Sequence, residues 1–224
     1  MTTEPVRSGS PGRPVVRTDD TDGRAAAIEV LRAGGIVAFP TDTVYGIAVA
    51  IATPGGIQRL FHVKRRAPEK GIVLLIADIG QAEAVGVLSE PARRLASAFW
   101  PGPLTLIVPA RPDAPLPGVL TGGGRGTVGI RVPDHPAPRA ICSAVGPLPT
   151  TSANRSGEAD ALDAASVVLQ LGDGVDLVLD GGRTTGGTAS TVLDLTVEPP
   201  TVLRLGALGV DRLRTVVAVA DEPS

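Results

Sequence analysis

Two lysines have the spacing in this sequence that points most directly to chemistry. They are Lys64 and Lys70, at the two ends of the heptapeptide KRRAPEK, and the other 19 of the 21 basic residues are arginines. A compact ammonium on a flexible stem suits a phosphate site. The segment is predicted to be the loop between a helix and a strand, so Lys64, Arg66 and Lys70 can form a polyphosphate clamp. Removing a loop lysine should leave folding almost untouched. A solvated charge cluster is the alternative.

Hydroxyl and amide groups gather in two further polar segments, each directly after a predicted buried strand. Residues 40–46, PTDTVYG, combine two threonines, a carboxylate and a phenol, and residues 149–157, PTTSANRSG, are mostly polar or small. In an open α/β sheet, ligands collect at strand ends, and hydroxyls with exposed amides suit phosphate oxygens. The alternatives are structural: a turn in which Asp42 bonds its own backbone, and a helix-capping loop.

An arginine and two glycine-rich segments are the remaining candidates. Arg131 lies within an apolar strand and can present a planar guanidinium to a carboxylate or phosphate, with a salt bridge to Asp134 as the alternative. Residues 180–191, DGGRTTGGTAST, permit close backbone approach or flexibility, and taken alone we interpret them as flexible. The run GGGRG at 122–126 has neither dinucleotide nor Walker spacing and indicates a mobile connection. No Ser-His-Asp or Cys-His set can be assembled, which favours binding and polarising chemistry.

Alternating strands and helices must position these groups. We expect a flexible segment over residues 1–20, one domain over 21–217 and a tail over 218–224. Caps and apolar spacing predict helices that begin at Thr21, Thr53, Ser89, Pro136 and Ala161. Short apolar runs predict strands at 35–39, 72–77, 104–108, 127–132, 148–151 and 177–179, followed by the segments 190–197 and 201–205. This alternation predicts an α/β fold whose sheet is mostly parallel or mixed and is covered by helices.

Composition argues against several classes of protein. A net charge of -2 and a pI of about 5.7 give no global positive field toward nucleic acid or membrane, and 2% aromatic residues offer few stacking platforms for RNA. One cysteine, Cys142, excludes an internal disulfide, and with only two histidines a zinc site is not expected. Without an apolar run of 18 residues or a signal peptide, we expect a cytoplasmic protein with no metal site and no membrane contact.

Six segments, taken in order along the chain, resemble the motifs of one family, the threonylcarbamoyl-AMP synthases, also called YrdC-like proteins. The resemblance runs from about Gly34 to Gly206. The motifs are PTDTVYG at 40–46, the K-x-R...K element formed by Lys64, Arg66 and Lys70, WPGPLT at 100–105, VGIRVP at 128–133, TSANRSG at 151–157 and VEPPTVLR at 197–204. Each motif alone is moderately specific, and six in order are strongly so.

The resemblance implies an open, twisted, mixed sheet with flanking helices and a concave cleft, similar to YrdC and RibB. It implies a reaction that joins L-threonine, bicarbonate or CO2, and ATP into threonylcarbamoyl-adenylate with release of pyrophosphate. This product feeds N6-threonylcarbamoylation of adenosine 37 in tRNA. The implied partners are downstream tRNA threonylcarbamoyl transferase proteins, with weak tRNA binding by the chain itself.

The family correspondence also implies a role for each matched residue. The catalytic cations, which would neutralise the leaving pyrophosphate with the help of Mg2+, are Lys64, Arg66 and Lys70. ATP would be held by these three residues together with Ser152, Asn154 and Arg204. L-Threonine would be held by Thr43, Arg131 and Ser190, with Arg131 on its carboxylate. The reaction needs three anionic reactants held together more than it needs a nucleophile on the protein.

Three residues depart from the family pattern. Ala67 separates the K-x-R arginine from the proline that usually follows it, Arg155 replaces a commonly apolar residue, and Leu75 stands where longer relatives carry a histidine near threonine. We also expect the single-domain bacterial form, without the extra C-terminal domain of those relatives. Two alternatives stay open. One is a carbamoyltransferase that makes carbamoyl-adenylate, which the lack of an acylphosphatase domain and zinc fingers disfavours. The other is a protein that binds RNA without catalysis.

Overall fold

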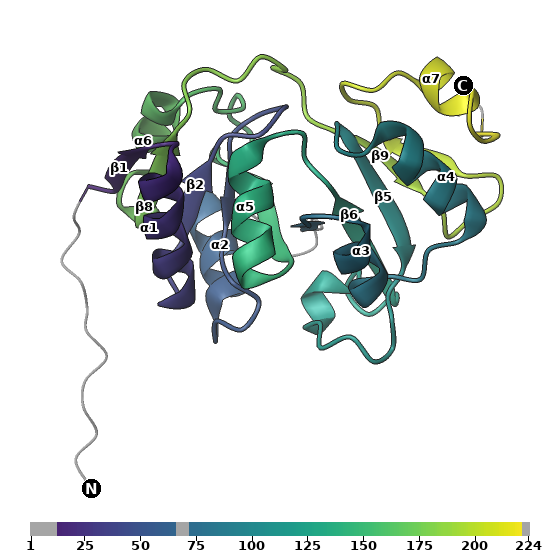
Figure 1. The fold of residues 1–224 in the computed structure, drawn as a ribbon, viewed down its shortest axis with the longest axis horizontal. Helices are drawn as coiled ribbons and strands as arrows, with labels where there is room; N and C mark the ends of the chain where they lie inside the picture. Colours follow the sequence, from purple (N-terminus) through teal and green to yellow (C-terminus); the bar gives the residue numbers. More distant parts are fainter. Residues whose placement is uncertain (1–12, 66–71, 221–224) are drawn as a thin grey trace, which may run out of the picture.

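A ten-stranded mixed sheet runs through the computed structural model, which describes residues 13–65 and 72–220 (Figure 1). The strand order is β1-β8-β2-β3-β7-β4-β6-β5-β9-β10. The strands are β1 Val15–Thr18, β2 Val37–Phe39, β3 Gly46–Ala48, β4 Val73–Leu75, β5 Leu104–Pro109, β6 Thr127–Arg131, β7 Leu148–Ser152, β8 Leu177–Asp180, β9 Thr191–Asp194 and β10 Thr201–Arg204. Some pairs, such as β4 with β6, are parallel and others, such as β4 with β7, are antiparallel. The predicted α/β class with a mixed sheet is confirmed.

Helices cover the sheet and enclose two hydrophobic cores. The first core lies under α1 (Thr21–Arg32) and α5 (Pro136–Val145), which stand next to each other in front of the sheet in Figure 1. The second core takes side chains from α2 Gly56–Lys64, α3 Ile79–Val85, α4 Glu90–Phe99, α6 Ala164–Leu171 and α7 Val210–Arg214. Alternation along β2 separates the two, because Val37 and Phe39 enter the first core and Ala38 enters the second. Two 3-10 turns, Gly118–Leu120 and Gly172–Gly174, complete the list of elements.

Side-chain caps explain why three of these helices begin where they do. Asp20 caps α1, Ser89 caps α4 and His135 caps α5, each by accepting a hydrogen bond from a backbone N–H of the first turn. Prolines in the first turns of α4 and α5 lack an N–H that would otherwise need a partner. The predicted starts of α4 and α5 are confirmed, and α1 is capped one residue before Thr21.

Several predictions about element boundaries are wrong. Helix α6 begins at Ala164 rather than Ala161, because Asp163 caps it. We expected no regular structure before Thr21, but β1 pairs with β8 at the sheet edge. Its side chains remain exposed, so backbone hydrogen bonds hold it without any apolar periodicity in the sequence. Helix α2 begins at Gly56 rather than Thr53, because Gly55, with a φ of 68°, ends a turn that precedes the helix. The short elements β3, α3 and α7 were not predicted, since three, seven and five residues carry little periodic signal.

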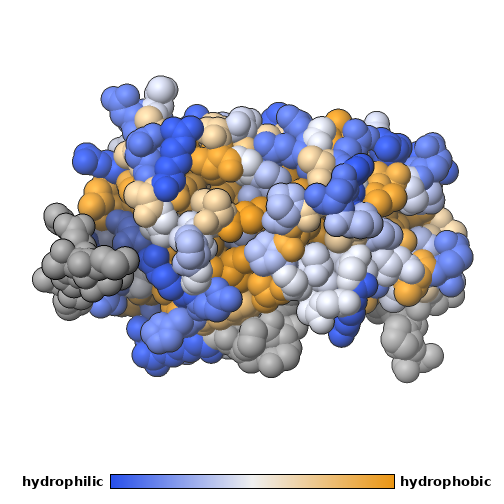
Figure 2. Space-filling view, turned by 90° about the horizontal axis from the view of Figure 1, so that it is seen from below, coloured by the Kyte–Doolittle hydropathy of each residue, from blue (hydrophilic) through white to orange (hydrophobic). Residues whose placement is uncertain are grey.

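The surface seen from below the view of Figure 1 alternates hydrophilic and apolar residues, with an apolar area between hydrophilic margins (Figure 2). Among the described residues, no helix combines the length and the apolar character needed to cross a bilayer.

Candidate functional site

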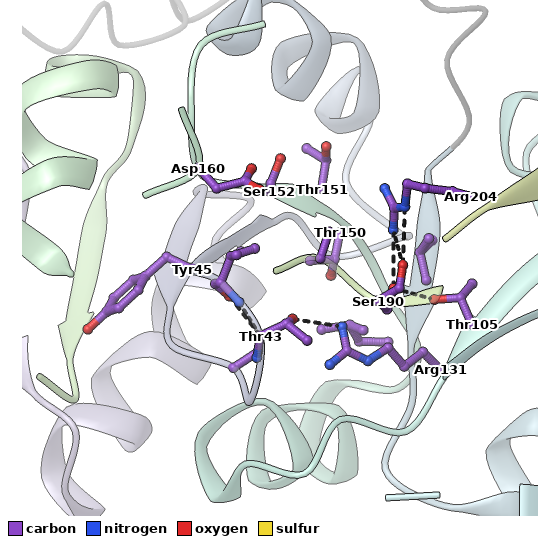
Figure 3. A pocket seen from close by; sticks show the side chains of 16 residues that line it. Thr43, Tyr45, Thr105, Arg131, Thr150, Thr151, Ser152, Asp160, Ser190 and Arg204 are labelled. Atoms are coloured by element: carbon purple, nitrogen blue, oxygen red, sulfur yellow. Dashed lines mark hydrogen bonds between the residues drawn. The ribbon is translucent and has the colours of Figure 1, made fainter. Parts of the chain in front are cut away.

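A cavity of about 300 Å³ brings together five of the residues that the sequence singled out. They are Thr43, Arg131, Ser152, Ser190 and Arg204. Each comes from a different part of the sheet: Thr43 from the loop between β2 and β3, Arg131 and Ser152 from the ends of β6 and β7, Ser190 from the residue before β9 and Arg204 from the end of β10 (Figure 3). The volume matches the lower end of small-molecule sites.

Arg131 is held in a buried network at one end of this cavity. Its Nε donates to the carbonyl oxygen of Gly102 at 3.0 Å, its Nη1 to Thr43 Oγ1 at 3.0 Å and its Nη2 to Asp42 Oδ1 at 2.6 Å. Burial lowers the pKa of Arg131, and the charge and hydrogen bond of Asp42 raise it. The alternative of a salt bridge to Asp134 is wrong. Asp134 instead donates its backbone N–H to Asp42 Oδ1, the oxygen that also accepts from Arg131, at 3.1 Å.

Ser190 and Arg204, expected to contact different reactants, contact each other. Arg204 donates from Nε and Nη2 to the Ser190 carbonyl oxygen at 3.1 and 2.9 Å, and from Nη2 to Ser190 Oγ at 3.2 Å. Ser190 Oγ also lies 2.9 Å from Thr105 Oγ1 of β5. Burial lowers the pKa of Arg204, while the charge of Asp160 raises it. Ser190 therefore links Arg204, at the end of β10, to Thr105 of β5 in the wall of the cavity.

Lys64 lies in helix α2 rather than on a loop, and it contacts Ser152 of the cavity lining. It is the last residue of α2, it is 2% exposed, and its ammonium donates to the backbone oxygen of Ser152, to Ser152 Oγ at 3.0 Å and to Asn154 Oδ1 at 3.0 Å. Ser152 Oγ in turn donates to Asn154 Oδ1 at 2.6 Å. The premise that Lys64 is a loop residue is therefore wrong, and we now expect its removal to affect folding, because it leaves buried acceptors without their donor. Arg66 and Lys70 lie outside the described residues.

The glycine-rich segment packs against the loop that carries Thr43, so the interpretation of this segment as flexible is wrong. A Cβ built on Gly186 would lie 2.4 Å from the carbonyl oxygen of Asp42 and 2.9 Å from Thr43 Cα. The N–H of Gly187 donates to the Thr43 carbonyl oxygen at 3.0 Å. Only a residue without a Cβ allows this backbone approach.

The Tyr45 phenol holds the start of the same glycine-rich segment. It donates to the carbonyl oxygen of Gly182 at 2.8 Å and accepts from the N–H of Gly181 at 3.2 Å. Burial raises the pKa of Tyr45 to about 12, so the phenol stays protonated and keeps its donor role. In Figure 3 the ring of Tyr45 points away from both Arg131 and Arg204.

The sequence analysis assigned no individual role to three polar side chains of the site. Asp42 was included in a candidate ligand segment, with a turn as the alternative, but its pairing with Arg131 was not predicted, and Thr105 was quoted only as part of a motif. Asp160 was not singled out at all, although it lines the cavity. Its only sequence signal is a carboxylate shortly after the polar segment 149–157. Leu75, one of the departures from the family pattern, also lines the cavity and presents an apolar side chain there.

Comparison with known proteins places this geometry in a family. The family model Sua5_yciO_yrdC, described as "Telomere recombination", matches residues 29–206. Threonylcarbamoyl-AMP synthase of Bacillus subtilis (strain 168) is 37% identical over 195 residues, which are 86% of this chain and 56% of that protein. Putative threonylcarbamoyl-AMP synthase of Mycobacterium tuberculosis (strain H37Rv) is 36% identical over 199 residues, 88% of this chain and 90% of that protein. This chain thus spans about half the length of the first relative and most of the second.

A solved structure shows the same fold. The crystal structure of Pyrococcus abyssi Sua5 complexed with L-threonine superposes with a TM-score of 0.84 at 33% identity, and the match covers 93% of this chain and 62% of that one. The predicted open, twisted sheet with flanking helices is therefore confirmed at the level of the whole fold.

Proposed function

Because the chain belongs to the Sua5/YciO/YrdC family, we propose that it joins L-threonine, bicarbonate or CO2, and ATP into threonylcarbamoyl-adenylate and releases pyrophosphate. The observation that carries the proposal is one cavity with a buried guanidinium and hydroxyls at one end and a second guanidinium with Ser152 toward the other. An amino-acid carboxylate and a nucleotide are ligands of matching chemistry. The names of the relatives point to the same reaction.

Arg131 is the proposed ligand of the threonine carboxylate. A guanidinium carries five N–H groups, of which three go to Gly102, Thr43 and Asp42. The remaining one on Nη1 and one on Nη2 have no partner within residues 13–65 and 72–220. Two such N–H groups match a carboxylate in a bidentate pair. Asp42 fixes the guanidinium plane, and Thr43 and Ser190 add hydroxyls beside it.

The reaction then depends mainly on holding the reactants in place. The threonine amine attacks CO2, a C–N bond forms, and the amine loses a proton to give a carbamate. A carbamate oxygen attacks the α-phosphorus of ATP, a P–O bond forms, and the bond to the β-phosphate breaks as pyrophosphate leaves. Alignment of three reactants in one cavity removes much of the entropic barrier to both steps.

The cationic residues would stabilise charge on the departing pyrophosphate. We propose Lys64, Arg66 and Lys70 for this role and place the nucleotide against Ser152, Asn154 and Arg204. Lys64 has a second role in the proposal, because its hydrogen bonds orient Ser152 and Asn154. The described residues contain no group of three or more His, Cys, Asp or Glu side chains that could hold a metal. Mg2+ would therefore bind chiefly to the phosphates of ATP and to water.

The product would pass to tRNA threonylcarbamoyl transferase proteins that modify adenosine 37 of tRNA. We propose that this takes place in the cytoplasm and that the chain itself contacts tRNA only weakly.

The test is incubation with ATP, bicarbonate and each amino acid in turn, with pyrophosphate release and mass detection of the adenylate as readouts. Pyrophosphate release should require both threonine and bicarbonate. Serine should substitute weakly, because one methyl group discriminates by only about 1–3 kcal/mol. Equal turnover with carbamoyl phosphate would contradict the proposal in favour of a carbamoyltransferase. Submicromolar, steeply salt-dependent tRNA binding without turnover would favour an RNA-binding protein.

A further inference from the structure

Asp160 is a carboxylate of the cavity that the proposed reaction leaves without a role. It is the only acidic side chain among the described residues that line the cavity. Within residues 13–65 and 72–220 it makes no hydrogen bond or salt bridge, whereas Asp42, the other carboxylate nearby, is committed to Arg131. The charge of Arg204 is close enough to interact with it, but a half-buried carboxylate that faces a cavity without a hydrogen bond from the described residues is available to a ligand.

The backbone fixes where Asp160 lies. The N–H of Tyr45 donates to the carbonyl oxygen of Ala161 at 2.9 Å, and the carbonyl oxygen of Tyr45 accepts from the N–H of Ala153 at 2.8 Å. The backbone of Tyr45 therefore fixes both Ala161 and Ala153. Asp160 and Ser152 are the residues immediately before these two alanines. Figure 3 shows Asp160 at the end of the cavity where Ser152 lies and well away from Arg131.

This position selects among the possible ligands. The threonine amine is one bond from the carbon that carries its carboxylate, so it stays near Arg131 and does not reach Asp160. A divalent cation would gain one carboxylate but would meet the positive charges of Arg204 and Lys64. A neutral hydroxyl donor has no such repulsion, and a carboxylate is a strong acceptor for it.

We propose that Asp160 accepts a hydrogen bond from a ribose hydroxyl of the bound nucleotide and so selects ribonucleotides over deoxyribonucleotides. This inference rests on the proposed function, because it takes the Ser152 end of the cavity to be the nucleotide end. Carboxylates recognise ribose hydroxyls in the same way in dinucleotide-binding folds. Asp160 would thus be a specificity residue, whereas the phosphate contacts fix the nucleotide's register.

The test is calorimetric titration with ATP, 2′-deoxy-ATP and 3′-deoxy-ATP, in the absence of amino acid and bicarbonate. The wild type should bind ATP about tenfold to a hundredfold more tightly than at least one of the deoxy analogues, as expected for a hydrogen bond to a charged group. Asp160→Ala and Asp160→Asn should abolish most of this ratio. Glu158→Gln, an exposed carboxylate of the same loop, is the matched control and should keep the ratio.

The ratio is the decisive quantity, because removal of any negative charge near the site raises the affinity for every anionic nucleotide. An unchanged ratio in both Asp160 variants overturns the inference. An affinity loss that appears with Mg2+ and vanishes with EDTA also overturns it, and assigns the carboxylate to the metal. Since the titration needs no turnover, ribose selection by Asp160 is measurable even if no threonylcarbamoyl-adenylate is made. Failure of the proposed function and failure of this inference are therefore separate results.

Discussion

The guanidinium of Arg131 and the carboxylate of Asp42 form an ion pair with 2.6 Å between Nη2 and Oδ1, and their side chains are only 6% and 14% exposed. Strand β6 supplies the arginine and the loop after β2 supplies the carboxylate, so the pair joins two strands that are not neighbours in the sheet. A charge withdrawn from water this far is stable only while its partner is present.

Asp42→Ala should therefore lower the free energy of unfolding by roughly 3–5 kcal/mol, the range for removal of one partner of a buried pair. Urea denaturation measures it. Asp113→Ala is the control, because Asp113 pairs with Arg111 at the surface, and its unfolding midpoint should match the wild type. An equal loss of stability in Asp42→Ala and Asp113→Ala would show that burial does not distinguish the two ion pairs.

Arg131→Ala should weaken threonine binding by about tenfold to a hundredfold, because charge-assisted hydrogen bonds to the carboxylate are lost. ATP affinity should change much less, since the nucleotide lies at the other end of the cavity. Calorimetry with each ligand separates the two effects. Arg183→Ala removes an exposed guanidinium and should change neither affinity. A collapse of ATP affinity with intact threonine binding would refute the role of Arg131.

Lys64→Ala should lower stability by roughly 2–4 kcal/mol, because three oxygens of Ser152 and Asn154 lose their ammonium donor. Lys64→Arg keeps the charge, but a planar guanidinium does not fit a site shaped around an ammonium, and adenylate formation should fall at least tenfold. Thermal melting and pyrophosphate release provide the readouts. Arg65→Ala, which removes the neighbouring exposed cation, is the control. Wild-type behaviour of Lys64→Arg would restore the charge-cluster alternative.

Gly186→Ala should displace the loop that carries Thr43, since the new Cβ meets backbone atoms of Asp42 and Thr43 that cannot rotate away. Overpacking of this kind costs about 1–3 kcal/mol, and threonine affinity should fall with it. Gly118→Ala, where a Cβ meets no atom within 4 Å, is the matched control. If the two variants bind threonine equally well, the close approach at Gly186 does not shape the site.

Stability should fall as the pH drops below about 6.5, the ordinary pKa of histidine, because of His135. Burial lowers its pKa, against the charges of Asp19, Asp42 and Asp134, which raise it, and with that of Arg24, which lowers it further. The unfolded chain therefore binds a proton before the folded chain does, which favours unfolding as the pH falls. Protonation at Nδ1 would also break the cap to Ala137.

The measurement is the urea midpoint between pH 7.5 and 5. His135→Asn keeps a capping oxygen and should flatten this dependence, whereas His62→Asn, at an exposed position, serves as the control. An identical slope in wild type and His135→Asn would assign the acid sensitivity to other groups.

A helix start was predictable where the cap residue itself begins the helix, as at α4, whereas the similar Thr53-Pro54 signal precedes a turn before α2. Ser89 and the proline two residues later act within one turn, so local chemistry decided the outcome. Apolar runs likewise located most strands, because burial on both faces leaves a continuous signal. Edge strand β1 gave none, since exposed side chains follow no period.

The candidate site was predictable in its members but not in its connections. Arg131 was recognised as a polar residue in an apolar strand, yet its partner, Asp42, is 89 residues away, whereas the expected partner Asp134 is near in sequence. Lys64 was assigned to the loop between a predicted helix and strand, and its acceptors, 88 and 90 residues further on, were not predicted as its partners. Only the register of the sheet brings such groups together, and no local pattern encodes that register.

The order of strands also dictates when the cavity becomes complete during synthesis of the chain. Strand β5 lies between β6 and β9, and β10, which carries Arg204, pairs only with β9 in the described sheet. The pairing of β9 with β5 joins segments that are far apart in sequence, and such pairings form late because large loops must close first. A nascent chain emerging from the ribosome would hence display helices and central strands well before it could capture a nucleotide. Binding competence arrives with the last strand, as a nearly all-or-none property of the finished domain.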